Sequence, residues 1–163
     1  MDKPKNKNYL AVMGQVNLDD IYVQQVFDYY RQRFLKNEST QLFVHQSPRI
    51  PSQLREHGFI CLCDRKLGLE LDGQRSLEGG AIRGSMKRIG LFLTKGGELF
   101  RNRVVFPEVD ERGHIVSATG YLYGKRIRAE QSAVIHWRRP EPEQYICQGM
   151  KLVKELTHAK AFH

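Results

Sequence analysis

The chain has 163 residues, of which 40% are hydrophobic, so it is long enough and apolar enough to fold as one domain around its own core. No apolar run approaches the ~18 residues of a membrane-spanning helix, which excludes a helical membrane protein. The formal net charge is +8, which favours a polyanionic partner.

The basic excess is concentrated in one part of the chain. Residues 83–139 contain twelve Lys or Arg against five Asp or Glu, whereas residues 1–82 have a net charge of +1 and residues 140–163 are neutral. A local basic surface attracts phosphate groups and releases their counterions. The pattern therefore favours a nucleic acid as the partner, with a solvated basic face as the alternative.

The first part of the chain predicts a disordered segment followed by an amphipathic helix. Residues 1–8 are polar and lysine-rich, which is typical of disorder. Asn17 or Asp19 can cap a helix that continues to about Lys36. Its apolar residues recur at helical spacing and predict a stripe that faces the core. These residues are Val23, Val26, Phe27, Tyr30 and Phe34.

Shorter elements are expected next. Residues 48–57 predict a turn into a short helix, and residues 59–71 predict one or two short buried strands. A second helix is expected over residues 76–89, although its three glycines weaken it. A short strand at 91–94 and a glycine turn at 95–97 then lead back toward the next strand.

The most regular pattern lies at residues 98–125 and predicts a β-hairpin. An apolar run closed by Pro107 and a second run after His114 read as two strands, because they flank the turn sequence DERG at residues 110–113. We predict an α+β fold with a small antiparallel sheet, its hairpin at about 103–123 and helices packed on one face.

The last part of the chain completes this expected domain. Residues 133–137 predict a strand, and residues 141–156 predict a C-terminal helix that flanks the domain as the N-terminal helix does. We place a single domain at residues 9–158, followed by a frayed tail at 159–163.

Arg101 and Arg103 are the first candidates for phosphate contact. In an extended backbone residues i and i+2 point the same way, so both guanidinium groups are expected to project from one face. The alternative is a surface salt bridge with Glu98 or Glu108, which is worth ~0–1 kcal/mol. Five more basic residues are candidates for the same interface. These are Lys87, Lys95, Lys125, Arg126 and Arg128.

The sequence shows no pattern of a metal or nucleophilic site. Cys61 and Cys63 lie in an apolar run without further ligands at zinc spacing, so we interpret them as buried thiols. Glu108 and Asp110 form an acidic pair, but turn formation explains Asp110 better than metal binding does. We expect no metal, no cofactor and no catalytic residue. Three cysteines and an N-terminus without a signal peptide favour the cytoplasm.

The segment FRNRVVFPEVDERGHIV, residues 100–116, resembles the one that opens the sheet of the bacterial DnaG-type primase core. The family pattern is F-R-x-R, two hydrophobic residues, F-P-x-x-D-x-x-G-x and two more hydrophobic residues. Eleven of the seventeen positions fit without a gap. A helix, a short strand, a glycine turn and the F-R-x-R strand also follow one another in the order of the primase core.

The resemblance covers about residues 19–123 and implies the N-terminal part of the polymerase core. In the family, basic residues of this part line a groove for single-stranded template and initiating nucleotides. A Toprim domain that follows holds the catalytic metals, and this sequence shows neither its motifs nor those of a primase zinc ribbon. The family's G-F-G-G-R-like run is replaced by residues 117–121, so Lys125 or Arg126 takes the place of the family arginine.

The resemblance implies a stand-alone, primase-core-like protein that binds single-stranded DNA, or an RNA/DNA hybrid, in replication of a phage, plasmid or other mobile element. It is not expected to be an enzyme by itself. Two alternatives stay open: a subunit of a split primase whose Toprim half is a separate polypeptide, and an adaptor or decoy for a replication protein. A Toprim-containing protein or a helicase is the expected protein partner, and no membrane is expected.

Overall fold

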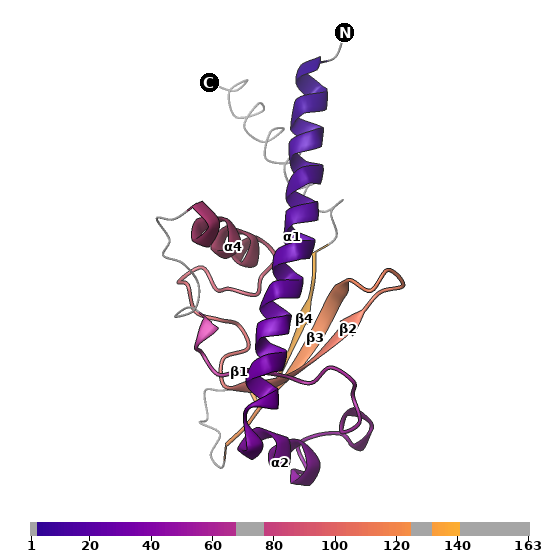
Figure 1. Cartoon of the computed structure of the whole chain (residues 1–163), viewed down its shortest axis with the longest axis vertical. Coiled ribbons are helices and arrows are strands. Elements are labelled where there is room, and N and C mark those ends of the chain that lie inside the picture. The colour runs from indigo at the N-terminus through magenta and orange to yellow at the C-terminus, as the bar shows by residue number, and fades with distance from the viewer. Residues whose placement is uncertain (1–2, 68–76, 125–131, 141–163) are drawn as a thin grey trace, which may run out of the picture. The chain divides into compact units, whose positions relative to one another are not determined.

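The computed structural model describes residues 3–67, 77–124 and 132–140 (Figure 1). The chain divides into two compact parts, residues 18–139 and residues 1–17 with 140–163. The part at 18–139 holds the whole sheet. None of the described helices is both long and apolar enough to cross a bilayer.

The helices are α1 (Lys3–Leu35), α2 (Glu38–Gln46), the 3-10 turn η1 (Ser52–Leu54) and α4 (Leu77–Arg88). The strands are β1 (Cys61–Cys63), β2 (Arg103–Val109), β3 (Ile115–Leu122) and β4 (Val134–Arg138). Helices α1 and α2 come first along the described residues and strands β2, β3 and β4 come last, in one antiparallel sheet, which makes the fold α+β.

Two features of the helices differ from the sequence prediction. Helix α1 begins at Lys3, well before the predicted caps, and Asp19 is instead buried and accepts hydrogen bonds from Ser85 and Arg88 of α4. Helix α2 was not predicted. Its cap is Asn37, whose side-chain oxygen accepts from the Thr40 backbone N–H at 3.0 Å. Asn37 thus lies just after the end of α1 and caps the start of α2.

The sheet has four antiparallel strands in the order β1-β2-β3-β4. The predicted hairpin is confirmed, since β2 pairs with β3 in the register Val104↔Tyr121 and Phe106↔Thr119. Gly113 at the turn has a φ of 81°, as the turn sequence predicts. The expected C-terminal helix and tail lie outside the described residues, and the domain boundaries stay a prediction.

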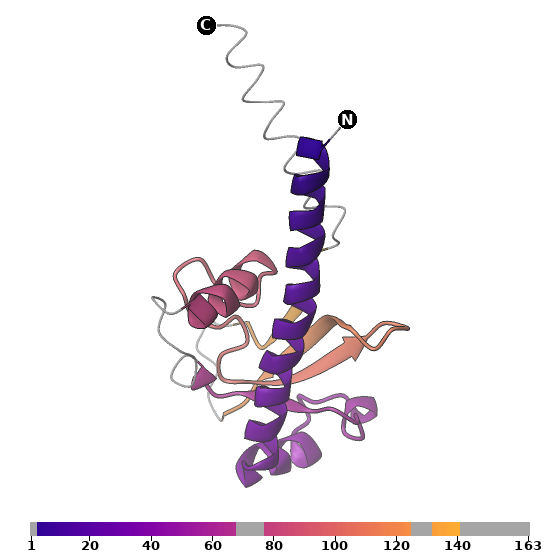
Figure 2. The same cartoon turned by 45° about the horizontal axis from the view of Figure 1, so that its top comes forward.

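Helix α1 after residue 17 passes over the sheet in both views (Figures 1 and 2). Phe27 of α1 lies against Trp137 of β4, with ring centroids 6.1 Å apart, and its carbonyl accepts from the Cys61 thiol of β1. The Trp137 indole N–H donates to the Ile89 carbonyl just after α4, at 2.8 Å. Helices α1 and α4 thus pack on one face of the sheet, as predicted.

Among the described residues, the cover of the other face lies at one end of the sheet. Side chains that alternate with those facing α1 form a second core cluster there with Val44 of α2 and with the end of α1. The strand residues in this cluster are Leu62, Val104, Phe106 and Tyr121. Helix α2 therefore adds a small cover that the sequence did not predict.

One close contact in the hairpin is open to a stability test. A Cβ added at Gly120 would lie 2.5 Å from Cδ1 of Phe100, which is 1% exposed. We expect Gly120→Ala to lower the free energy of unfolding by ~1–3 kcal/mol, because a packed ring must move. Urea denaturation followed by the fluorescence of Trp137, the single tryptophan, measures this change.

Gly84→Ala is the matched control. A Cβ at this exposed position in α4 meets nothing within 4 Å, so the substitution should stabilise the protein by ~0.5–1 kcal/mol. Equal effects of the two substitutions would contradict the packing role of Gly120.

Candidate nucleic-acid interface

The two arginines of the F-R-x-R segment have different environments. Arg101 is exposed in the turn before β2, whereas Arg103 is the first residue of β2 and only 5% exposed. Asn102 between them has a φ of 58°, so the backbone is not extended there. The rule that i and i+2 point the same way requires an extended backbone. The expectation that both guanidinium groups project from one face is therefore wrong.

The guanidinium group of Arg103 is engaged inside the protein. It donates to the carbonyl oxygens of Arg101 at 3.1 Å and Ser132 at 2.8 Å, and its stem lies against Gly120. Burial, followed by the nearby charge of Arg101, lowers the pKa of Arg103. These acceptors are carbonyls rather than the carboxylates of the salt-bridge alternative. Arg103 holds the turn in front of β2 in place.

Arg101 lines a pocket of ≈ 190 Å³, which we call the arginine pocket. Three guanidinium-bearing residues line it, each from a different segment of the chain. They are Arg65 after β1, Arg83 in α4 and Arg101 before β2. Guanidinium groups bind phosphate oxygens through paired N–H donors. The pocket therefore has the chemistry of a phosphate site.

A tight turn forms one side of the arginine pocket. The Leu93 N–H donates to the Gly97 carbonyl at 2.7 Å, and the Gly96 N–H donates to the Leu93 carbonyl at 2.8 Å. Gly96 has a φ of 95°, which favours glycine. Because Gly96 and Gly97 carry no side chain, the backbone leaves room for a ligand beside Arg101.

The two other described candidate residues flank this pocket in the chain. Lys95 is exposed and belongs to the turn that lines the pocket. Lys87 is exposed on α4, four residues after Arg83, so both lie on the same side of the helix. Both lysines are therefore placed to extend a basic surface around the arginines.

Glu98 is the one carboxylate that lines the arginine pocket among the described residues. It is 8% exposed and accepts hydrogen bonds from the Tyr30 hydroxyl at 2.7 Å and the Cys63 thiol at 3.4 Å. Burial raises the pKa of Glu98, although its two donors act in the opposite direction. Burial and the charge of Glu98 raise the pKa of Cys63, which keeps this donor protonated.

Backbone strain also accompanies this site. Among the described residues, Arg65 and Asn102 are the non-glycine residues with positive φ, at 66° and 58°. Each such residue costs of order 1 kcal/mol, and strain of this kind clusters at functional sites. One of the two lines the arginine pocket and the other follows Arg101 directly.

The remaining basic residues fall into two groups. Some are predicted candidates that lie outside the described residues, and others line the pocket but were not predicted from the sequence. Lys125, Arg126 and Arg128 lie outside the described residues. Arg65 and Arg83 were not predicted, because no spacing in the sequence links them to Arg101. No group of three His, Cys, Asp or Glu side chains placed to hold a metal ion occurs among the residues that the structure describes.

Comparisons with solved structures identify similar folds. The zinc-binding and RNA polymerase domains of the Aquifex aeolicus primase match 78% of this chain and 30% of that chain, with a TM-score of 0.57 and 19% identity. A DnaG primase catalytic domain bound to ssDNA matches 80% of this chain and 42% of that one, with a TM-score of 0.56 and 17% identity. A DnaG catalytic core has a TM-score of 0.54, with 18% identity over 76% of this chain and 38% of that one.

The chain therefore has the fold of a part of the DnaG-type primase core, as the sequence resemblance implies. It spans less than half the length of each of these three structures. No protein-family model and no curated protein matches the sequence.

The different roles of the two arginines predict different effects on stability. Arg103→Gln should lower the free energy of unfolding by ~1–3 kcal/mol, because it removes charge-assisted hydrogen bonds from a buried position. Arg101→Gln should change it by less than ~0.5 kcal/mol, because Arg101 is exposed. Urea denaturation of both variants measures the difference. Similar stabilities would show that Arg103 is not a structural residue.

The raised pKa of Glu98 predicts a pH dependence of stability. The folded protein holds this proton more tightly than the unfolded chain, so stability should fall as pH rises from about 4.5 through the raised pKa. Glu98→Gln keeps an oxygen for Tyr30 and should remove this part of the slope. Urea denaturation from pH 4.5 to 8 measures the profiles. Glu108→Gln, at an exposed position, is the control and should keep the wild-type slope.

Proposed function

We propose that this protein binds single-stranded DNA through the arginine pocket and acts in primase-type DNA replication. The observation that carries the proposal is the convergence of Arg65, Arg83 and Arg101 on one small pocket. Among the described residues, three arginines and one carboxylate line the pocket, and guanidinium groups at such a site are donors that match phosphate oxygens. The other partners expected from the sequence are an RNA/DNA hybrid and a Toprim-containing protein or a helicase. These partners, the mobile-element origin and the cytoplasmic location stay predictions.

The shape of the site favours a single strand over a duplex. The arginine pocket of ≈ 190 Å³ has room for one phosphate group of a nucleic-acid backbone. A single strand bends enough to seat one phosphate in the pocket while its neighbours contact the lysines at 87 and 95. Such contacts fix the backbone and do not read the sequence. A similar fold solved with ssDNA bound supports the proposal.

Glu98 has a defined place in this proposal. Its carboxylate lines the same pocket as the three arginines and opposes an incoming phosphate when ionised. Because burial raises its pKa, Glu98 takes up a proton at a higher pH than an exposed glutamate does. Phosphate binding should therefore be tighter when Glu98 is neutral.

A salt series on a fluorescent single-stranded oligonucleotide tests the proposal. Each phosphate neutralised on a single strand contributes ~−0.7 to the slope of log K against log salt. Arg101→Gln should therefore weaken binding and flatten the slope by ~0.7, and the double variant Arg65→Gln with Arg101→Gln by ~1.4. The weakening should be the same for oligonucleotides of different sequence. Glu98→Gln should strengthen binding at pH values above the raised pKa of Glu98, where the wild-type carboxylate is ionised.

Arg112→Gln is the matched control for charge. This exposed arginine lies in the hairpin turn, at the opposite end of β2 from Arg101 and ~20 Å away at ~3.3 Å per residue. It should leave the slope nearly unchanged. If Arg101→Gln and the double variant bind as Arg112→Gln does, the arginine pocket does not bind the strand. Equal affinity for a duplex of the same length would contradict the preference for single strands.

A further inference from the structure

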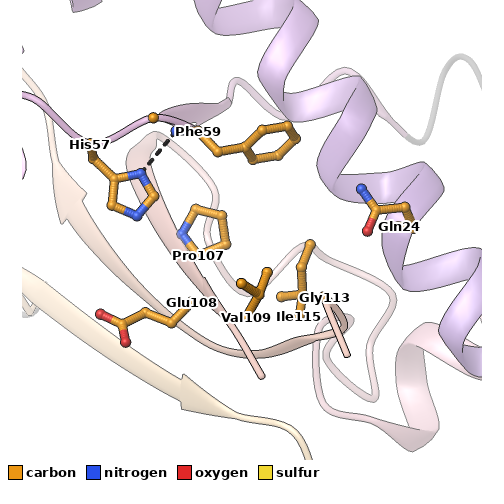
Figure 3. Close-up of a pocket in the computed structure, with 9 residues that line it drawn as sticks. Gln24, His57, Phe59, Pro107, Glu108, Val109, Gly113 and Ile115 are labelled. Carbon is orange, nitrogen blue, oxygen red and sulfur yellow. Dashed lines mark hydrogen bonds between the residues drawn. The ribbon is translucent and has the colours of Figure 1, made fainter. Parts of the chain in front are cut away.

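A second pocket, of ≈ 490 Å³, lies at the turn end of the hairpin (Figure 3). We call it the hairpin-tip pocket. It lies between α1, the segment at residues 57–59 and the ends of β2 and β3 that meet at the turn. Its walls are mainly apolar side chains. These are Phe59, Pro107, Val109 and Ile115.

Pro107 explains why this pocket exists. Strand β1 pairs with β2 from Cys63 to Cys61, which lies opposite Val105. Continued in the same register, Phe59 would lie opposite Pro107. Pro107 remains paired with β3, so its nitrogen, which has no hydrogen to donate, must face the side of β1. The ladder between β1 and β2 therefore ends, and the two segments part and leave an opening.

The hairpin turn holds the other side of the pocket in one conformation. The side-chain oxygen of Asp110 accepts from the backbone N–H groups of Arg112 and His114, both at 2.9 Å. These two hydrogen bonds lower the pKa of Asp110, and the one from His114 has the larger effect. Gly113, which lines the pocket, adopts a φ of 81° in this turn. A preformed wall reduces the entropy that a ligand must lose on binding.

The pocket is part of an exposed apolar surface. Val109 is 60% exposed although it lines the pocket, and Ile21 of α1 is 52% exposed. Ile21 lies one helical turn before Gln24, which also lines the pocket, so the apolar surface extends along α1. Exposed apolar side chains that line or adjoin a pocket are a feature of surfaces that bind other molecules.

The charges around the pocket are mainly acidic, in contrast to the rest of this basic chain, although the guanidinium carbon of Arg31 lies 5.7 Å from the centroid of the Phe59 ring. Glu108 lines the pocket, and no lysine or arginine does so among the described residues. Gln24 donates to the carboxylate of Asp28 at 2.9 Å, which places a second carboxylate beside the rim. Carboxylates repel phosphate groups and attract cationic side chains. The two carboxylates therefore favour a cationic segment of a partner over a nucleic acid as the occupant.

We propose that the hairpin-tip pocket is a docking site for a segment of a partner protein that carries an apolar side chain next to a lysine or arginine. The apolar side chain enters between Phe59 and Val109, and the cation faces Glu108. The volume is within the range of pockets that bury one or two large side chains. This site is separate from the arginine pocket, so a partner and a single strand bind at the two ends of β2 without competing.

Titration with small peptide probes, followed by the backbone amide resonances of the protein, tests this proposal. The probes are acetyl-Phe-Lys-amide, acetyl-Phe-Glu-amide and acetyl-Ala-Lys-amide. The Phe-Lys probe should shift amides at residues 57–59, 108–109 and 113–115 and bind more tightly than the other two. Glu108→Lys should weaken the Phe-Lys probe by about two- to fivefold and reverse the preference toward Phe-Glu.

Glu111→Lys is the matched control, because it makes the same change of charge in the turn without lining the pocket. It should keep the preference for Phe-Lys. Val109→Ser should weaken both phenylalanine probes without affecting binding of single-stranded DNA. The proposal is overturned if the phenylalanine probes shift none of these amides, or if Glu108→Lys and Glu111→Lys behave alike. It is also overturned if a single-stranded oligonucleotide shifts these amides and the peptides do not.

Discussion

The buried guanidinium group of Arg103 is the constraint on which the candidate interface depends. It joins the turn before β2 to the segment before β4 by hydrogen bonds to the carbonyls of Arg101 and Ser132. Its stem and the ring of Phe100 both lie against Gly120, where any larger residue would displace them. The turn is thereby held in the conformation that leaves Arg101 exposed. Of the two arginines in the F-R-x-R segment, Arg103 supports the turn and Arg101 is available to a ligand.

The hairpin also separates two kinds of surface. Its first residue adjoins a pocket with three arginines, and its turn adjoins an apolar pocket with a carboxylate. Because β2 is extended, these surfaces lie ~20 Å apart, about 2.5 Debye lengths at physiological salt. The electrostatic potential of one surface is therefore largely screened at the other. In the two proposals made above, one rigid element carries both a phosphate site and a surface for a protein partner.

Much of the fold could be predicted from local patterns in the sequence. The apolar stripe from Val23 to Phe34 has helical spacing, and all five of its residues are buried against the sheet or the core. The turn residues Asp110 and Gly113 fixed the position of the hairpin, since one side chain accepts backbone N–H groups and the other residue adopts positive φ. Local signals were ambiguous at Asn37, which suits the end of one helix and the start of another.

The sequence by itself determined the hairpin, the core stripe and the likeness to the primase core, because each depends on residues close together in the chain. Only the tertiary structure decided which arginine is exposed, since positive φ at Asn102 breaks the extended geometry that their spacing suggested. It also brought Arg65, Arg83 and Glu98 to Arg101 from separate segments. Burial and pocket chemistry depend on neighbours that are distant in sequence, and no local pattern records them.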